Sequence, residues 1–231
     1  MRRKQFLAFL ARTLALLGLP GCVAEQPALP PARAPAMQQE ITLPTPRSPG
    51  EKSLEAILAL RRSVRDYVTY TLTLAEIGQL FWAAQGMTAS WGGRTAPSAG
   101  ATYPLEIYAA TPQGCYHYLP RDQKAELIAQ GDLREKLWEA GLRQDSIRSA
   151  AVVFVIMAIY ERTSPRYADR APRYVHLEAG HAAQNLLLQA VALGLGAVPV
   201  GAFDDEKVQA ALALPADYKP LYLIPVGRPK S

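Results

Sequence analysis

Residues 61–67, which read RRSVRDY, carry three arginines and a serine within five positions. Guanidinium groups in such a cluster suit a phosphate, because arginine can bind its oxygens through two parallel hydrogen bonds. A simpler interpretation stays open, in which these cations end a helix and only complement its dipole.

Two further stretches are rich in small residues and lie where a predicted strand enters or leaves the core. In APSAGATYPLEIY, residues 96–108, an alternating strand pattern follows a run of small residues. Glycine is common where backbone must approach a partner closely or adopt unusual dihedral angles. In GLGAVPVGAFDD, residues 194–205, small residues lie where a strand leaves the sheet, so that free amides can donate to a ligand. Taken singly, the two stretches also fit a plain loop and a glycine-rich strand end.

Other kinds of chemistry find no support in the sequence. The three histidines are far apart, and of the two cysteines one lies in the N-terminal stretch, so no metal site is expected. There is no nucleophile elbow, no P-loop and no glycine-rich dinucleotide motif after a strand. Four of the five net positive charges come from basic residues that precede the first acidic residue, Glu25. The rest of the chain is therefore close to neutral, and its charge does not indicate nucleic acid binding.

The N-terminus has the pattern of an export signal. Residues 1–22 begin with basic residues, continue with an apolar run and end in LPGC, which resembles a bacterial lipobox with Cys22 as the lipidated residue. A cleaved signal or an uncleaved anchor is the alternative. Residues 23–50 are rich in Pro and Ala and are expected to be a tether, so that the folded domain spans residues 51–231. We expect an exported protein, periplasmic or at the cell surface, with a lipid anchor in a bacterial membrane.

Helix and strand patterns alternate within the domain and predict an α+β fold, with one mixed sheet between helices. Helices are expected at 51–62, at 73–86 with a Thr73–Glu76 capping box, at 124–130, at 133–142, from 173 to 194 or 196, and from Asp204 to 212. Strands are expected at 105–110 and 115–119 as a hairpin, at 149–160 as a buried strand, at 197–203 and at 218–227.

The stretches RRSVRDY, PSAGATYPLEIY, RYVHLEAGHAAQNLLLQAVALGLGAVPVGAFDD and YLIPVGRPK occur in this order. In that order they resemble the FMN-dependent nitroreductase family, and most closely its SagB/ThcOx-type dehydrogenase branch. The resemblance covers most of residues 51–231. It implies a nitroreductase-like fold in an intertwined homodimer, with two FMN molecules at the interface and each site built from both chains.

The resemblance also implies roles for single residues. The FMN phosphate and ribityl chain would be held by Arg61, Arg62, Ser63 and Arg65, with a further phosphate contact from Arg228 or Lys230. The isoalloxazine ring would be faced by Pro97, Ser98 and Gly100 of the partner subunit. Its other side would be lined by Pro199, Val200, Gly201 and Ala202, with the amide of Gly201 or Ala202 directed at the flavin N5 atom.

The expected activity is ping-pong hydride transfer through the flavin to a small organic substrate. Azoline oxidation in peptide maturation is an alternative, but enzymes of that type carry Lys-Tyr where this chain has Arg166-Tyr167. Arginine keeps its proton and cannot act as a base, which leaves Tyr167 as the candidate catalytic proton donor. An exported enzyme would lack nicotinamide cofactors, so a quinone or oxygen is expected as redox partner. A ligand-binding lipoprotein without catalysis is a further alternative.

Overall fold

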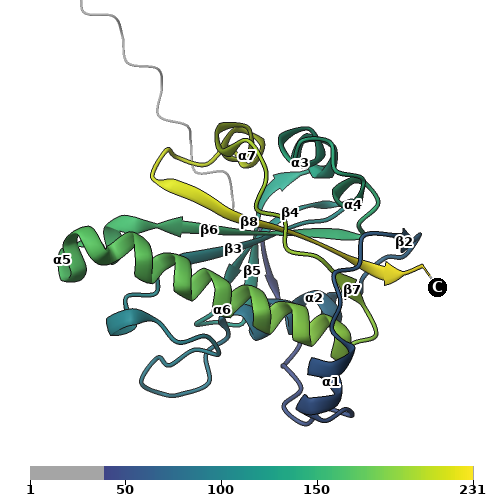
Figure 1. Ribbon diagram of the computed structural model, residues 1–231, viewed down its shortest axis with the longest axis horizontal. Helices are drawn as coiled ribbons and strands as arrows, with labels where there is room; N and C mark the ends of the chain where they lie inside the picture. The colour runs from purple at the N-terminus through teal and green to yellow at the C-terminus, as the bar shows by residue number, and fades with distance from the viewer. Residues whose placement is uncertain (1–38, 231) are drawn as a thin grey trace, which may run out of the picture. The chain divides into compact units, whose positions relative to one another are not determined.

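The computed structural model describes residues 39–230, which form a sheet with helices on both faces (Figure 1). The sheet has the order β1-β5-β4-β3-β6-β8-β2, and β7 pairs with β8. The strands are β1 (Glu40–Thr42), β2 (Tyr67–Val68), β3 (Leu105–Ala110), β4 (Gly114–Leu119), β5 (Lys124–Gln130), β6 (Val152–Ile159), β7 (Gly196–Ala197) and β8 (Tyr218–Pro229). The helices are α1 (Leu54–Leu60), α2 (Leu74–Gln85), α3 (Arg134–Ala140), α4 (Asp145–Arg148), α5 (Ser164–Tyr167), α6 (Ala171–Ala192) and α7 (Asp205–Leu212). Short 3₁₀ turns are η1 (Ala99–Ala101), η2 (Tyr160–Arg162) and η3 (Ala168–Arg170).

Strand β6 is the centre of the sheet. All of its residues are buried, as expected for a β-branched run that is covered on both faces. Phe154 and Ile156 point into the core beneath α2 and α6, whereas Val155 and Met157 point into the core on the opposite face. The expected α+β arrangement is thus confirmed.

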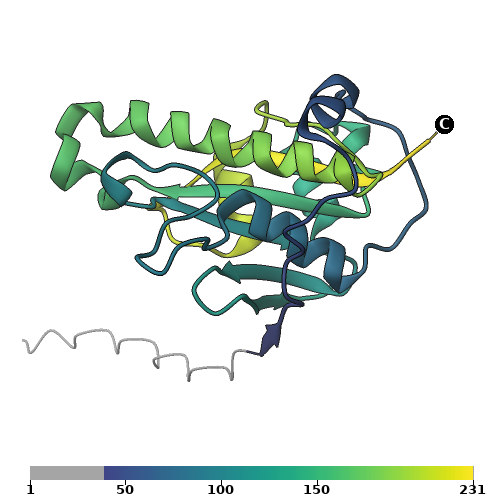
Figure 2. The same cartoon turned by 90° about the horizontal axis from the view of Figure 1, so that it is seen from below.

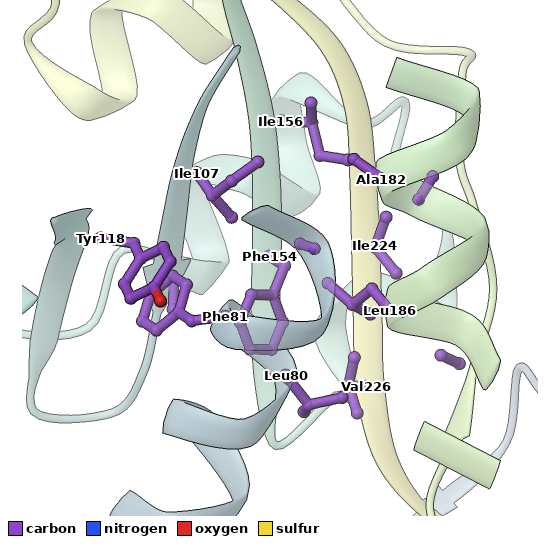
Figure 3. Packing of buried hydrophobic residues seen from close by; sticks show 14 of the residues in the cluster. Leu80, Phe81, Ile107, Tyr118, Phe154, Ile156, Ala182, Leu186, Ile224 and Val226 are labelled. Carbon is purple, nitrogen blue, oxygen red and sulfur yellow. The ribbon is translucent and has the colours of Figure 1, made fainter. Parts of the chain in front are cut away.

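Aromatic packing fixes α2 on one face of the sheet. The ring of Phe81 stacks on Tyr118 at a centroid distance of 4.9 Å and meets the edge of Phe154 at 5.3 Å (Figure 3). Beside these rings, Leu186 of α6 lies over Ile224 of β8 (Figure 3). The two helices therefore share one core with the central strands.

One expected helix is wrong. Residues 124–130 form strand β5, paired with β4 on one side and β1 on the other. Their sequence, KAELIAQ, consists mainly of good helix formers, but pairing with two neighbouring strands outweighs that local preference. The other strand pairs are also antiparallel, and the mixed pairing that we expected is limited to an isolated parallel bridge between Ser63 and Ala197.

The folded unit begins before Glu51. Residues 40–42 pair with β5, and Leu43 is buried, although we predicted both as tether. The predicted signal, Cys22 and most of the tether lie outside the described residues. Within residues 39–230, no helix combines the length and apolar character needed to cross a membrane.

The N-terminus of α2 provides a test of local stability. Thr73 accepts a hydrogen bond from the Glu76 amide at 3.2 Å, and Glu76 accepts one from the Thr73 amide at 2.7 Å, so the predicted capping box is confirmed. Thr73→Ala should lower the free energy of unfolding by about 0.5–2 kcal/mol, measured by urea titration. The exposed Thr71, which precedes the box, is the control, and Thr71→Ala should change that energy by less than about 0.5 kcal/mol. Equal effects of the two substitutions would contradict the role of the cap.

Candidate functional site

Strand β8 gathers the expected phosphate-binding segments at one end of the sheet. The Val64 amide donates to the Ala197 carbonyl at 3.1 Å, next to the bridge between Ser63 and Ala197. Strands β7 and β2 both pair with the last residues of β8, and the Lys230 amide donates to the Asp66 carbonyl at 3.0 Å. Segments 61–66 and 228–230, far apart in the sequence, therefore lie side by side.

Close approach of these segments depends on Gly196. A Cβ atom at this position would lie 2.7 Å from the Val64 side chain, a distance that real Cβ atoms do not adopt. The glycine therefore lets the arginine-rich segment pack directly on β7.

The cations at this end of the sheet are largely uncompensated. No described acidic side chain forms an ion pair with Arg61, Arg65, Arg228 or Lys230. Arg62 is partly used otherwise, since its Nη1 donates to the carbonyls of Ala59 and Arg61 at 2.9 and 2.8 Å. Such a cluster of positive charge suits an anionic ligand.

A few residues after β7, the chain presents two free amides, those of Gly201 and Ala202. Val200 exchanges both backbone hydrogen bonds with Leu223, which anchors the segment to β8. The amides of Gly201 and Ala202 donate to no acceptor among the described residues, and both residues are exposed. On the other side, the Gln144 side chain donates to the Ala202 carbonyl at 2.9 Å. The segment is therefore held in place while two donors remain available to a ligand.

The third predicted segment, residues 97–104, lies elsewhere. It contains η1 and packs against α5, where Arg166 Nη1 donates to the Gly100 carbonyl at 3.2 Å. Gly100 has a φ of 60°, and a Cβ there would lie 2.8 Å from both the Arg166 side chain and the Tyr167 hydroxyl. A side chain at this position would be strained and would require Arg166 and Tyr167 to move.

Tyr167 lies beside this segment with its hydroxyl unoccupied. The hydroxyl has no hydrogen-bond partner within the part of the chain that the structure describes, and the ring packs edge-on against Tyr174 at 4.7 Å. Its neighbour Arg166 holds Gly100, a structural role that the sequence did not indicate.

A buried carboxyl group lies behind the same segment. Glu178 of α6 is 2% exposed, and Gln85 Nε2 donates to its carboxylate at 3.4 Å. Arg94 in turn donates to Gln85 at 3.0 Å and stacks over the Tyr103 ring. Burial raises the pKa of Glu178 to about 7, although the hydrogen bonds from Ser98 and Gln85 and the charge of Arg94 act in the opposite direction.

The sequence analysis missed Glu178. Its position in the sequence could have identified it, because on the long helix Glu178 lies on the same face as the buried residues Val175 and Ala182. An acid on an apolar helix face requires polar partners from another element.

A second missed group fixes the end of the segment at Tyr103. Glu106 of β3 bonds His117 at 2.6 Å and forms an ion pair with Arg162, whose Nη1 also donates to the Tyr103 carbonyl at 3.2 Å. Burial alone would raise the pKa of Glu106, but the hydrogen bond from His117 and the charges of His117 and Arg162 outweigh it and hold that pKa below its usual value.

The two halves of the predicted site lie toward opposite ends of α6. Residues 97–104 pack against α5, which precedes the start of α6, whereas β7, on which the arginine-rich segment packs, follows the end of α6 (Figures 1 and 2). A helix of 22 residues is about 33 Å long. One chain thus brings together segments 61–65, 199–202 and 228–230 but keeps Pro97, Ser98 and Gly100 apart from them. The assigned roles of all these residues stay predictions.

Comparison with known proteins agrees with this geometry. The model of the nitroreductase family matches residues 58–228. MJ1384 of Methanocaldococcus jannaschii, whose name assigns it to the nitroreductases, is 46% identical over 184 residues, covering 77% of this chain and 92% of its own.

Solved structures show the same fold. A Ralstonia eutropha protein, also named for the nitroreductases, is 32% identical and aligns with a TM-score of 0.76 over 83% of this chain and 90% of its own. A more distant one from Desulfovibrio desulfuricans, solved in complex with FMN, is 22% identical and has a TM-score of 0.60, over 78% of this chain and 88% of its own. The predicted nitroreductase-like fold is confirmed, and the chain belongs to the nitroreductase family of oxidoreductases.

Proposed function

We propose that this protein is an FMN-dependent oxidoreductase that binds the flavin at the end of β8. The observation that carries the proposal is that one strand, β8, pairs both with the segments that carry the uncompensated cations and with Val200, which directly precedes the two free amides of Gly201 and Ala202. The phosphate of FMN needs cations, and the acceptor nitrogen of its ring needs a hydrogen-bond donor. The FMN complex of the Desulfovibrio relative supports this choice of cofactor.

Bound FMN would supply reversible hydride exchange at its N5 atom. The chain's contribution would be to bind and orient it: Arg61 and Arg65 would hold the phosphate, with Ser63 nearby and Arg228 or Lys230 as a further cation. An amide of residue 201 or 202 would donate to N5 and orient the ring, and a donor that is already fixed costs no reorganisation during the reaction.

We further propose that the second wall of each site comes from a partner chain in a homodimer. Several large apolar side chains remain exposed in the single chain: Leu54 (59%), Leu58 (50%) and Leu60 (57%) on α1, and Leu177 (51%) on α6. Such exposure is typical of a surface that another subunit covers. A partner would also bring its Pro97, Ser98 and Gly100 to the flavin.

The substrate is proposed to be a small organic molecule or a peptide that meets the flavin beside Tyr167. The free hydroxyl of Tyr167 can deliver a proton there. Arg166 binds the Gly100 carbonyl, which makes azoline oxidation with a basic residue at this position the less favoured alternative. Ligand binding without catalysis is the other alternative.

The cofactor proposal predicts a yellow protein whose colour disappears with dithionite and returns in air. The double variant Arg61→Ala with Arg65→Ala should lose FMN affinity, with a cost of about 1.5–3 kcal/mol for each charged hydrogen bond removed. Affinity is measured by quenching of flavin fluorescence.

The matched control removes two exposed cations far from the site, Arg121→Ala with Lys219→Ala. It should bind FMN as the unmodified protein does. A colourless protein that cannot be reconstituted with FMN would rule out the flavoenzyme, and equal affinities of the two double variants would rule out the phosphate assignment.

The proton-donor proposal predicts that Tyr167→Phe retains flavin and its spectrum but slows turnover. After reduction by dithionite, stopped-flow mixing with menadione should show reoxidation slowed by about 10²-fold or more, because the proton donor is gone. The control is Tyr174→Phe, which removes the hydroxyl of the neighbouring ring. An unchanged rate of reoxidation in Tyr167→Phe would show that Tyr167 is not the proton donor and has only a structural role.

We also propose that the chain is exported and anchored to a bacterial membrane through lipidated Cys22, with a quinone or oxygen in place of a nicotinamide cofactor. The N-terminal LPGC pattern supports this location. In cells fed labelled palmitate, the full chain should acquire label and sediment with membranes, and Cys22→Ser should do neither. Label in the serine variant, or none in the unmodified protein, would contradict lipidation at this residue.

A further inference from the structure

Tyr160 and His176 form a hydrogen-bonded pair that the proposed function does not use. The Tyr160 hydroxyl lies 2.6 Å from His176 Nε2, and the two rings meet edge-on with their centroids 5.8 Å apart. Tyr160 of η2 is half-buried and packs against the core beneath α6, whereas His176, near the start of α6, is exposed. One member of the pair is therefore fixed in the protein, and the other faces outward.

The contact with Tyr160 determines where His176 carries a proton. Burial raises the pKa of Tyr160, and the negative charge of Asp205 adds to this effect, so the phenol keeps its proton at neutral pH. A neutral imidazole therefore accepts the hydrogen bond at Nε2 and carries its own proton on Nδ1, and an imidazolium carries one there as well. Nδ1 has no hydrogen-bond partner among the described residues. It is thus a donor that remains available in either charge state of the ring.

His176 lies on the side of α6 that faces away from α2. Glu178 bonds Gln85 of α2 and thereby marks the side toward that helix. His176, two residues earlier, lies about 160° away around the helix axis. The two helices lie side by side over the sheet, with α6 over β8 (Figure 3). The side that carries His176 therefore faces the edge of β8 that pairs with β7 and with Val200.

The pair is a short way along the strands from the two free amides. A Cβ atom at Gly201 would lie 4.0 Å from the ring of Tyr222, so the amides are level with that residue. Tyr222 is paired with Ile156 of β6. Ile159, three residues further along that strand, directly precedes Tyr160. At the usual rise per residue of a strand, the separation is about 10 Å, which one small organic molecule can span.

Gly180 keeps the side of α6 open between the pair and the amides. It lies one helical turn after His176, and therefore on the same side of the helix. A Cβ atom at Gly180 would meet nothing within 4 Å outside its own stretch of helix. A ligand that extends from the amides toward His176 would thus meet no side chain at this position.

We propose that His176 binds the substrate, through a hydrogen bond from Nδ1 to an oxygen atom of a molecule that lies between this residue and the flavin. A quinone is the class that fits, because it carries a second carbonyl oxygen across the ring from the one that approaches the flavin. Tyr160 is a positioning residue that holds the imidazole. The inference rests on the proposed function, because it requires the flavin beside Gly201 and Ala202. The contact adds a hydrogen bond and transfers neither electrons nor protons.

The test follows reoxidation of the FMN-loaded, dithionite-reduced protein by menadione in a stopped-flow instrument, over a range of menadione concentrations. His176→Phe removes the donor and should raise the menadione concentration at half the limiting rate about 2- to 10-fold, as expected for the loss of one hydrogen bond. The limiting rate should change less, because the contact is already formed before the reaction. Ferricyanide, which offers no carbonyl oxygen, should reoxidise the variant and the unmodified protein equally fast.

Three further variants separate substrate binding from general effects. His176→Gln keeps a side-chain donor and should lose less than His176→Phe. Tyr160→Phe keeps its ring but frees the imidazole, and should show part of the same loss. Combined with His176→Phe it should add nothing more, because the two residues act as one unit. His181→Phe, at another exposed histidine of α6, is the matched control and should behave as the unmodified protein does.

An unchanged half-saturating concentration in His176→Phe, or an additional loss when Tyr160→Phe is combined with it, would overturn the inference. So would equal slowing with ferricyanide or loss of bound FMN from His176→Phe, since His176 would then support the fold or the cofactor. An unmodified protein that binds no FMN would refute the proposed function, and the inference with it.

Discussion

Pairing along β8 is the interaction on which the candidate site depends. One edge of this strand is joined to β6 in the middle of the core, and its other edge pairs with β7, with Val200 and with β2. These backbone hydrogen bonds bring several cations to one end of the sheet without acidic partners among the described residues. The repulsion between like charges opposes such an arrangement, so a site of this kind indicates selection for an anionic ligand rather than for stability.

Small residues in the site have two different causes, room for a ligand and close packing within the chain. The sequence suggests that bare backbone makes room for a flat ligand, and the exposed amides of Gly201 and Ala202 agree with that. Gly196 and Gly100, however, make close contacts within the same chain, with Val64 and with the Arg166–Tyr167 pair. A glycine near a predicted ligand therefore does not by itself mark a ligand contact.

What the sequence predicted well was encoded locally. The capping box of α2, the helix α7, the hairpin of β3 and β4 and the buried β6 each depend on residues close together in the chain. What it missed depends on distant partners: KAELIAQ becomes a strand because β1 and β4 flank it. Glu178 is buried on α6, and the side chain that donates to it, Gln85, comes from another helix, α2.

The segment that we propose to contact a partner's flavin is ordered within a single chain. Because α6 separates residues 97–104 from the cations of their own chain, the proposed contribution of this segment to a flavin site requires an interface. Its conformation is fixed by Arg166 at Gly100, by Thr163 at Thr102 and by Arg162 at Tyr103. Order that is established within each chain does not have to be acquired on binding, which lowers the entropic cost of assembling the site.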